Sequence, residues 1–171
     1  MTESSIMSWN ASQGFCTEVV FVKSRVEDCF EQGLLKKIRP NLNYAEQSTK
    51  QAEHFLDEAE TLIQAGLKDM AFIALYNASF HAARALLFRD GVKERSHYCV
   101  CKYIEEKYQL KELVTMQQAV ILDSLRTKRN DIQYSLEQPE IEEDLNEIFD
   151  EVTEFIERVK EIIKKGQKPK E

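Results

Sequence analysis

Glycine and proline are scarce in this chain, and their scarcity limits its folds more than any other feature. The 171 residues include five glycines and three prolines, about 5% together, where an average protein has roughly 12%. Tight turns, hairpins and phosphate-binding loops are built from these residues. A many-stranded sandwich or barrel is therefore disfavoured, and the glycine-rich motifs of dinucleotide and P-loop sites are absent. Long helices are the expected structure.

Apolar residues recur at helical spacing along most of the chain. The spacing predicts an all-α, up-and-down bundle of five helices, over about 41–66, 70–88, 97–108, 112–134 and 141–163. Pro40 separates an N-terminal extension, residues 1–39, from the bundle, residues 40–165, and residues 166–171 form a tail. In the extension we expect a loose start up to Gly14 and a helix from about Ser24 to Ile38, while Glu18–Val22 is either a strand or part of a helix.

The stretch from Met70 to Phe88 is apolar on all sides and carries a single charge, Arg84. Such a helix is either buried at the centre of a bundle or spans a membrane. An arginine in the middle of a membrane span costs about 3 kcal/mol, so we interpret this segment as a central buried helix and expect no membrane contact.

Negative charge is concentrated at the C-terminal end of the chain. Residues 137–171 contain twelve acidic and six basic residues, which accounts for most of the net charge of −7. No long basic tract occurs, so charge alone does not indicate duplex-DNA binding. The first ten residues, MTESSIMSWN, carry neither a basic region nor an apolar run, so we expect no signal peptide and a cytoplasmic location.

The four cysteines, Cys16, Cys29, Cys99 and Cys101, are too few for a disulfide scaffold, and we expect them to be reduced. Cys99 and Cys101 form a C-x-C pair. Two residues span about 200° of a helix, so this pair points to opposite sides. We therefore expect no metal site and no cofactor.

Two predicted helices carry polar residues on apolar faces. Arg129 continues the inward stripe of Leu122, Leu125 and Ile132. An unpaired buried guanidinium costs several kcal/mol, so Arg129 must pair with a carboxylate or meet an anion.

On the central helix, Asn77, His81 and Arg84 are spaced by four and three residues and share one face. If this face meets that of Arg129, the four residues form a pocket suited to phosphate. The alternative is structural: Arg129 pairs with Asp131 or Asp123, and His81 is a hydrogen-bonded core residue.

Two segments of the chain resemble the HEPN domain family. YNASFHAARALLFRDGVKERSH (Tyr76–His97) is similar to the second helix of that family and the turn after it. RNDIQY (Arg129–Tyr134) lies where the family carries an Arg-Asn-x-x-x-His signature. The resemblance extends over roughly Gly33–Ile163, including the stretch LLKKIRP found in some archaeal and bacterial members.

The resemblance implies a small helical bundle, a homodimer, whose motif helices form a shared cleft. Many members are metal-independent RNA endonucleases of toxin–antitoxin, CRISPR-associated or defence systems, and others only bind RNA or nucleotides. Small members are often paired with a minimal nucleotidyltransferase. By position, the resemblance assigns Arg129, Asn130 and Tyr134 to catalysis and adds Arg126 to Asn77, His81, Arg84 and Arg129 as binding residues.

The chain departs from the family pattern at the histidine. Tyr134 occupies this position, and with an ordinary pKa near 10 only about one phenol in a thousand is ionised at pH 7. Tyrosine is therefore a poor general base, and His81 or His97 would have to replace the missing imidazole. The tyrosine that receives AMP in some paired members corresponds to Leu136, so that regulation is not expected.

Three functions remain open from the sequence. The first is binding of RNA or a nucleotide in an arginine-lined cleft, by one component of a toxin–antitoxin-type pair. The second is a metal-independent endoribonuclease toxin that uses the same cleft. The third is a non-catalytic helical adaptor or dimerisation protein.

Overall fold

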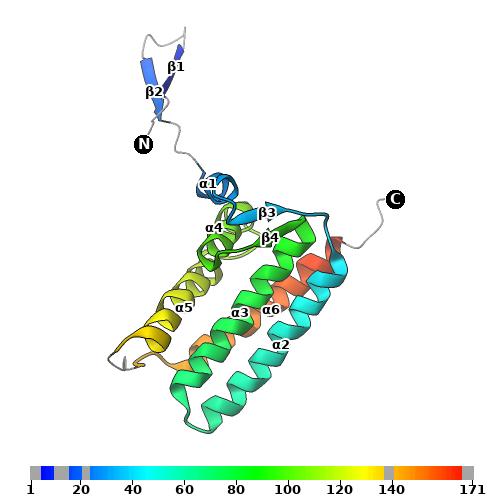
Figure 1. Cartoon of the computed structure of the whole chain (residues 1–171), viewed down its shortest axis with the longest axis vertical. Helices are drawn as coiled ribbons and strands as arrows, with labels where there is room; N and C mark the ends of the chain where they lie inside the picture. The colour runs from blue at the N-terminus through cyan, green and yellow to red at the C-terminus, as the bar shows by residue number, and fades with distance from the viewer. Residues whose placement is uncertain (1–4, 10–15, 21–23, 137–140, 167–171) are drawn as a thin grey trace.

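A computed structural model of the chain describes residues 5–9, 16–20, 24–136 and 141–166. Most of these residues are helical, and they form a bundle with two small two-stranded sheets (Figure 1). The prediction of an all-α bundle with an N-terminal extension is confirmed, with local corrections described below.

Three long helices form one layered half of the bundle: α2 (Leu42–Gln64), α3 (Lys68–Asp90) and α6 (Leu145–Gly166). Figure 1 shows α2 beside α3, with α6 packed behind both. Fully buried alanines line both α2 and α3, and their small side chains let the two backbones approach closely. Asn41 caps α2 by accepting from the Tyr44 amide at 3.0 Å, and Gly66 follows its end at φ 71°.

The helix α3 is the centre of the core, as its sequence predicts. It contacts α2, α4, α5 and α6, and fourteen of its residues are buried. Within the part of the chain that the structure describes, α3 alone is long and apolar enough to cross a membrane, and most of it lies inside the bundle. This burial makes α3 the core helix of the bundle.

The second half of the bundle consists of α4 (His97–Lys107), the 3₁₀ turn η1 (Gln109–Lys111) and α5 (Met116–Tyr134). The prediction placed the start of α5 at residue 112, four residues too early. Thr115 and Gln118 form a capping box there, which fixes the first turn of α5. Asp90 at the end of α3 accepts hydrogen bonds from Tyr108 at 2.7 Å and Tyr103 at 3.1 Å, which fastens this half to the core helix.

The expected helix over residues 24–38 is wrong in its second half. Helix α1 (Arg25–Glu31) ends early, because Gly33 adopts φ 69° and turns the chain. Strand β3 (Leu35–Lys37) then pairs antiparallel with β4 (Val92–Glu94). Gly91 makes this pairing feasible, since a Cβ atom there would lie 2.7 Å from the Ile38 carbonyl oxygen.

The start of the chain also differs from the expected loose terminus. Strands β1 (Ser5–Trp9) and β2 (Cys16–Val20) form an antiparallel hairpin, which Figure 1 shows beyond α1 and away from the bundle. For Glu18–Val22, where the sequence left a strand or a helix open, the strand is therefore the correct alternative. Strand β2 begins two residues earlier, at Cys16. Pro139, between the helices predicted over 112–134 and 141–163, lies outside the described residues.

The expectation of reduced cysteines is wrong for two of the four. Cys29 of α1 and Cys99 of α4 form a disulfide, because α1 packs directly on α4. Burial raises the pKa of the free Cys101 thiol to about 12, so it stays protonated. Ser24 and the Val26 amide also donate to the Glu106 carboxylate, which anchors α1 to α4 a second time.

Candidate anion-binding site

Arg129 lies near the C-terminal end of α5, and its charge is not neutralised by any carboxylate that the structure describes. Its guanidinium sits 5.5 Å from the ring centre of Tyr76 and 5.8 Å from that of Tyr134, and it donates to the Asn130 side chain at 3.1 Å. The pairing with Asp131 or Asp123 that the sequence left open is not formed. Two aromatic rings therefore hold a half-buried cation ready to meet an anion.

Tyr76 and His97 form a hydrogen-bonded pair beside this cation. Tyr76 is buried on α3, and its hydroxyl contacts Nδ1 of His97, the first residue of α4. Burial raises the pKa of Tyr76 to about 12. Burial also lowers the pKa of His97, and the charges of Arg129, Arg84 and Arg126 lower it further. Both groups are thus neutral at pH 7. A phenol that donates to Nδ1 leaves the ring proton on Nε2, where it can be given to an anion.

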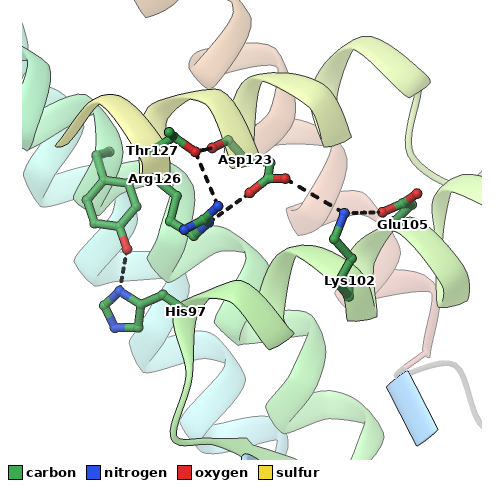
Figure 2. Close-up of polar contacts among 7 residues, drawn as sticks. His97, Lys102, Glu105, Asp123, Arg126 and Thr127 are labelled. Carbon is green, nitrogen blue, oxygen red and sulfur yellow. Dashed lines mark hydrogen bonds and ion pairs between the residues drawn. The ribbon is translucent and has the colours of Figure 1, made fainter. Parts of the chain in front are cut away.

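Arg126, one turn before Arg129, has a different electrostatic setting. Its Nε donates to Asp123 at 2.7 Å, and the same carboxylate lies 3.7 Å from Lys102, which also pairs with Glu105. Figure 2 shows this chain of alternating charges between α4 and α5. Arg126 and Lys102 both lie over the Tyr98 ring. Because Asp123 already compensates the charge of Arg126, Arg126 contributes less to an anion site than Arg129 does.

His81 and Arg84 lie on the other side of α3, against α2. Ser48 of α2 donates to the His81 carbonyl oxygen at 2.8 Å, and the His81 ring stacks on Phe55. Burial, aided by the charges of Arg84 and His97, lowers the pKa of His81 to about 4. Arg84 pairs with Glu94 of β4, with 2.8 Å between Nε and Oε1.

The predicted residues are thus divided between two groups. Arg129, Asn130 and Tyr134 gather at the end of α5, next to Arg126. His81 and Arg84 share a cavity between α2 and α3 whose lining includes neither Arg126 nor Arg129. Asn77 is half-buried on α3, one turn before His81.

Sequence reasoning missed Tyr76 as part of the site. Its ring and hydroxyl contact Arg129 and His97, but in an apolar helix it looks like an ordinary core residue. One signal was present: a buried tyrosine needs a hydrogen-bond partner for its hydroxyl. His97 was considered only as a substitute imidazole, and its position beside Arg129 makes it better placed than His81.

The fold and the site define a small helical protein with an arginine beside two tyrosine rings, and not one with a glycine-rich phosphate loop. The model of the HEPN domain matches residues 45–163, which is more than two thirds of the chain. The chain therefore belongs to the HEPN family, in which the role is related to RNA or nucleotides. A search among curated proteins finds no match.

Proposed function

We propose that this HEPN protein binds RNA or a nucleotide through the cleft around Arg129. The observation that carries the proposal is the guanidinium of Arg129, held between two tyrosine rings with no carboxylate partner among the described residues. Such a cation binds a phosphate with charge-assisted hydrogen bonds. His97 adds a neutral N–H donor at the same place.

The aromatic rings of the cleft favour a single-stranded nucleic acid. The Tyr134 side chain is 72% exposed, so its ring is open to an unpaired base. Stacking of bases on tyrosine and on guanidinium planes is how proteins recognise unpaired RNA. A chain of net charge −7 lacks the electrostatic footprint of a duplex binder, which agrees with this choice.

The test is a titration of a fluorescent single-stranded RNA with the purified protein, read by anisotropy at low and moderate salt. Arg129→Ala is expected to weaken binding, and Arg25→Ala, an exposed arginine at the start of α1, is the matched control. Equal affinity of the two variants would contradict the proposal. A non-catalytic adaptor instead predicts no RNA binding at any salt concentration.

A second candidate function, metal-independent RNA cleavage, is favoured by the contact of His97 with Tyr76 beside Arg129. In this reaction the ribose 2′-oxygen attacks the adjacent phosphorus and loses its proton, the bond from phosphorus to the 5′-oxygen breaks, and that oxygen gains a proton. In this reaction Arg129 would stabilise the developing negative charge. His97 would take the tautomer with its proton on Nδ1, directed to the Tyr76 oxygen, so that Nε2 could accept the 2′-hydroxyl proton and return it to the 5′-oxygen.

Incubation of the protein with RNA in EDTA separates the two functions. Ends bearing 2′,3′-cyclic phosphate that disappear in both Arg129→Ala and His97→Ala would establish cleavage. Intact RNA that remains bound would establish the binding function alone.

We further propose that the protein is a homodimer and works with a minimal nucleotidyltransferase in a toxin–antitoxin-type pair. Exposed apolar side chains support a partner surface at the start of α5, where Met116 is 68% and Val120 is 61% exposed. Light scattering after size-exclusion chromatography is expected to give a dimer that Val120→Asp dissociates. A neighbouring reading frame for a minimal nucleotidyltransferase would support the pairing.

A further inference from the structure

One covalent bond links helix α1 to the part of the bundle that carries the Arg129 site. Cys29 of α1 and Cys99 of α4 form a disulfide, and both residues are almost completely buried, at 4% and 0% exposed. Cys99 lies two residues after His97, whose ring contacts Tyr76 beside Arg129. The bond therefore joins α1 to the first turn of α4, the turn that begins with a residue of the site.

The first turn of α4 depends on contacts with other elements. Within the residues that the structure describes, Ser96 makes no capping hydrogen bond to this turn through its side chain. Instead, three residues contact three elements: His97 contacts α3, Cys99 is bonded to α1, and Cys101 lies against α5. The position of His97 thus depends in part on the bond that Cys99 makes to α1.

Apart from the disulfide, α1 has few contacts that fasten it to α4. The helix has seven residues, too few to be stable alone in water, and its buried side chains are Val26 and Cys29. The Glu106 carboxylate accepts from the Ser24 hydroxyl and from the Val26 amide, the latter at 3.2 Å. Without the disulfide, this carboxylate and the packing of Val26 and the partly buried Phe30 would hold α1. We therefore expect α1 to leave α4 readily once the bond is broken.

The core of the bundle does not need the disulfide. Disulfides stabilise mainly small domains that cannot build a sufficient hydrophobic core. Here α3 alone buries fourteen residues, whereas α1 contributes two buried residues to the same core. The β3–β4 pairing also holds the chain that follows α1. Reduction is therefore expected to free α1 and leave the bundle folded.

Reduction by a dithiol breaks the bond in two exchange steps. When α1 opens, a thiolate of the dithiol attacks the sulfur of Cys29, the less deeply buried cysteine, and the Cys99 sulfur leaves and gains a proton. The second thiol then displaces Cys29, so the dithiol is oxidised to a disulfide and both cysteines become thiols. Cys101 does not exchange with them, because burial raises the pKa of its thiol to about 12 and keeps it protonated. The chain thus has two states at this place, bonded and open.

We propose that the Cys29–Cys99 bond is a redox switch for the Arg129 site. In the bonded state, α1 holds the first turn of α4, and His97 stays against Tyr76 beside Arg129. In the open state this turn is loose, His97 leaves Tyr76, and the site loses the N–H donor that His97 offers to a phosphate. The inference rests on the proposed binding of RNA at Arg129, whose regulation it describes.

The first measurements need no RNA. The full chain is studied by NMR and by hydrogen exchange, once in oxidised glutathione and once in dithiothreitol, and thiol titration verifies that the two states differ by two thiols. Reduction is expected to shift the ring resonances of His97 and to leave those of His54, an exposed histidine of α2, in place. Amide exchange is expected to become at least tenfold faster in α1 and in the first turn of α4, and to stay unchanged in α2.

RNA affinity is then compared between the two states by anisotropy. Reduction is expected to weaken binding about fivefold, the effect of one lost hydrogen bond from His97. Cys29→Ser is expected to bind RNA weakly in both buffers. Cys101→Ala, which removes a thiol outside the bond, is expected to keep the full redox response. Glu106→Ala, which removes the other anchor of α1, is expected to keep full affinity in oxidised glutathione.

Four results would overturn the inference. The bond does not form in oxidised glutathione; reduction changes neither the His97 resonances nor the amide exchange of α1; reduction unfolds the whole bundle, as seen by circular dichroism; or both states bind RNA equally while Arg129→Ala weakens binding. Failure of the proposed function gives a different pattern, in which neither state binds RNA. A shift of His97 on reduction would then still support the switch, and unchanged His97 resonances would overturn it.

Discussion

Arg84 and Arg129 lie on opposite sides of α3, and they differ in the groups that compensate their charges. Arg84, on the α2 side, lies on the Phe88 ring and pairs with Glu94, whose side chain is only 8% exposed. Arg129, on the α4–α5 side, lies on the Tyr76 ring and has no carboxylate among the described residues. Both cations have aromatic support, so the carboxylate is what separates a structural arginine from one that is free to bind a ligand.

The largest difference between the two sides is expected from the disulfide, because it fastens only one of them. Cys29–Cys99 ties α1 to α4 two residues after His97, and closes a loop of 70 residues. Such a loop stabilises the folded state by about 4 kcal/mol through the entropy of the unfolded chain. Cys29→Ala/Cys99→Ala is expected to lower the free energy of unfolding, measured in urea, by this amount.

NMR of the same double variant compares the two sides directly. The His97 resonances are expected to shift, while those of His81, held by α2, stay in place. Cys101→Ala, which removes a thiol outside the disulfide, is the control. A decrease of less than 1 kcal/mol in the free energy of unfolding of the double cysteine variant, or equal shifts of the resonances of both histidines, would contradict the assignment of the disulfide to the α4–α5 side.

The second prediction concerns stability and compares the two arginines themselves. Arg84→Met leaves the buried Glu94 carboxylate without its cation, and is expected to cost about 2 kcal/mol, less than for a fully buried pair because Arg84 is 29% exposed. Arg129→Met breaks no ion pair and is expected to change stability by less than about 0.5 kcal/mol. Urea denaturation measures both.

The double variant Arg84→Met/Glu94→Leu tests the cause. Removal of both charges is expected to restore most of the lost stability, since a well-packed apolar pair replaces a buried ion pair at little cost. If the double variant is as unstable as Arg84→Met alone, the loss comes from packing on Phe88 and not from the unpaired carboxylate.

The sequence predicted the helices well, because their signals are local. Asn41 and Gly66 mark the ends of α2, and the apolar composition of 70–88 identified α3 as the central helix. The prediction failed where distant segments meet. The β3–β4 pairing and the Cys29–Cys99 bond join segments far apart in the chain, which apolar periodicity does not report. The Thr115 capping box is a local Thr-x-x-Gln signal, and the predicted start at residue 112 overlooked it.

The site was predicted in part for the same reason. The position of Arg129 on an apolar stripe singled it out as a cation in need of a partner, and the spacing of His81 and Arg84 placed them on one face. Their role in binding stays a prediction. The pairing of Arg84 with Glu94 joins α3 to β4 and is a tertiary contact that no sequence pattern reports. Asp123 and Arg126 form a local i,i+3 pair on α5, a spacing that the sequence does show.

The third prediction extends the comparison to the two arginines of α5. Arg129→Ala is expected to weaken RNA binding about 30-fold, the loss of a charge-assisted contact of roughly 2 kcal/mol. Arg126→Ala is expected to weaken it only about threefold, because Asp123 already holds this cation. Asp123→Asn frees Arg126 and leaves Lys102 paired with Glu105 alone, and it is expected to raise the affinity for RNA and steepen its salt dependence. Equal effects of the two arginine variants would remove the distinction between paired and unpaired cations.

The smallest expected effect is the response of the two histidines to pH. The pKa of His81 is about 4 in the folded protein and ordinarily near 6.5 in the unfolded chain. Between these values the unfolded chain binds a proton that the folded protein does not, so stability falls as the pH decreases from 6.5 to 4. His81→Gln is expected to reduce this slope, whereas His54→Gln, which replaces an exposed histidine of α2, is expected to leave it unchanged.

RNA binding is expected to move only one of the two histidine pKa values. A phosphate at Arg129 cancels part of the positive charge that lowers the pKa of His97, so this pKa rises in the complex. The pKa of His81 is lowered chiefly by burial and by the charge of Arg84. RNA bound at Arg129 does not neutralise that charge. An NMR titration of both rings with and without RNA measures the difference. A rise at His81 without one at His97 would mean that the RNA phosphate lies on the Arg84 side of α3, and would reverse the roles of the two arginines.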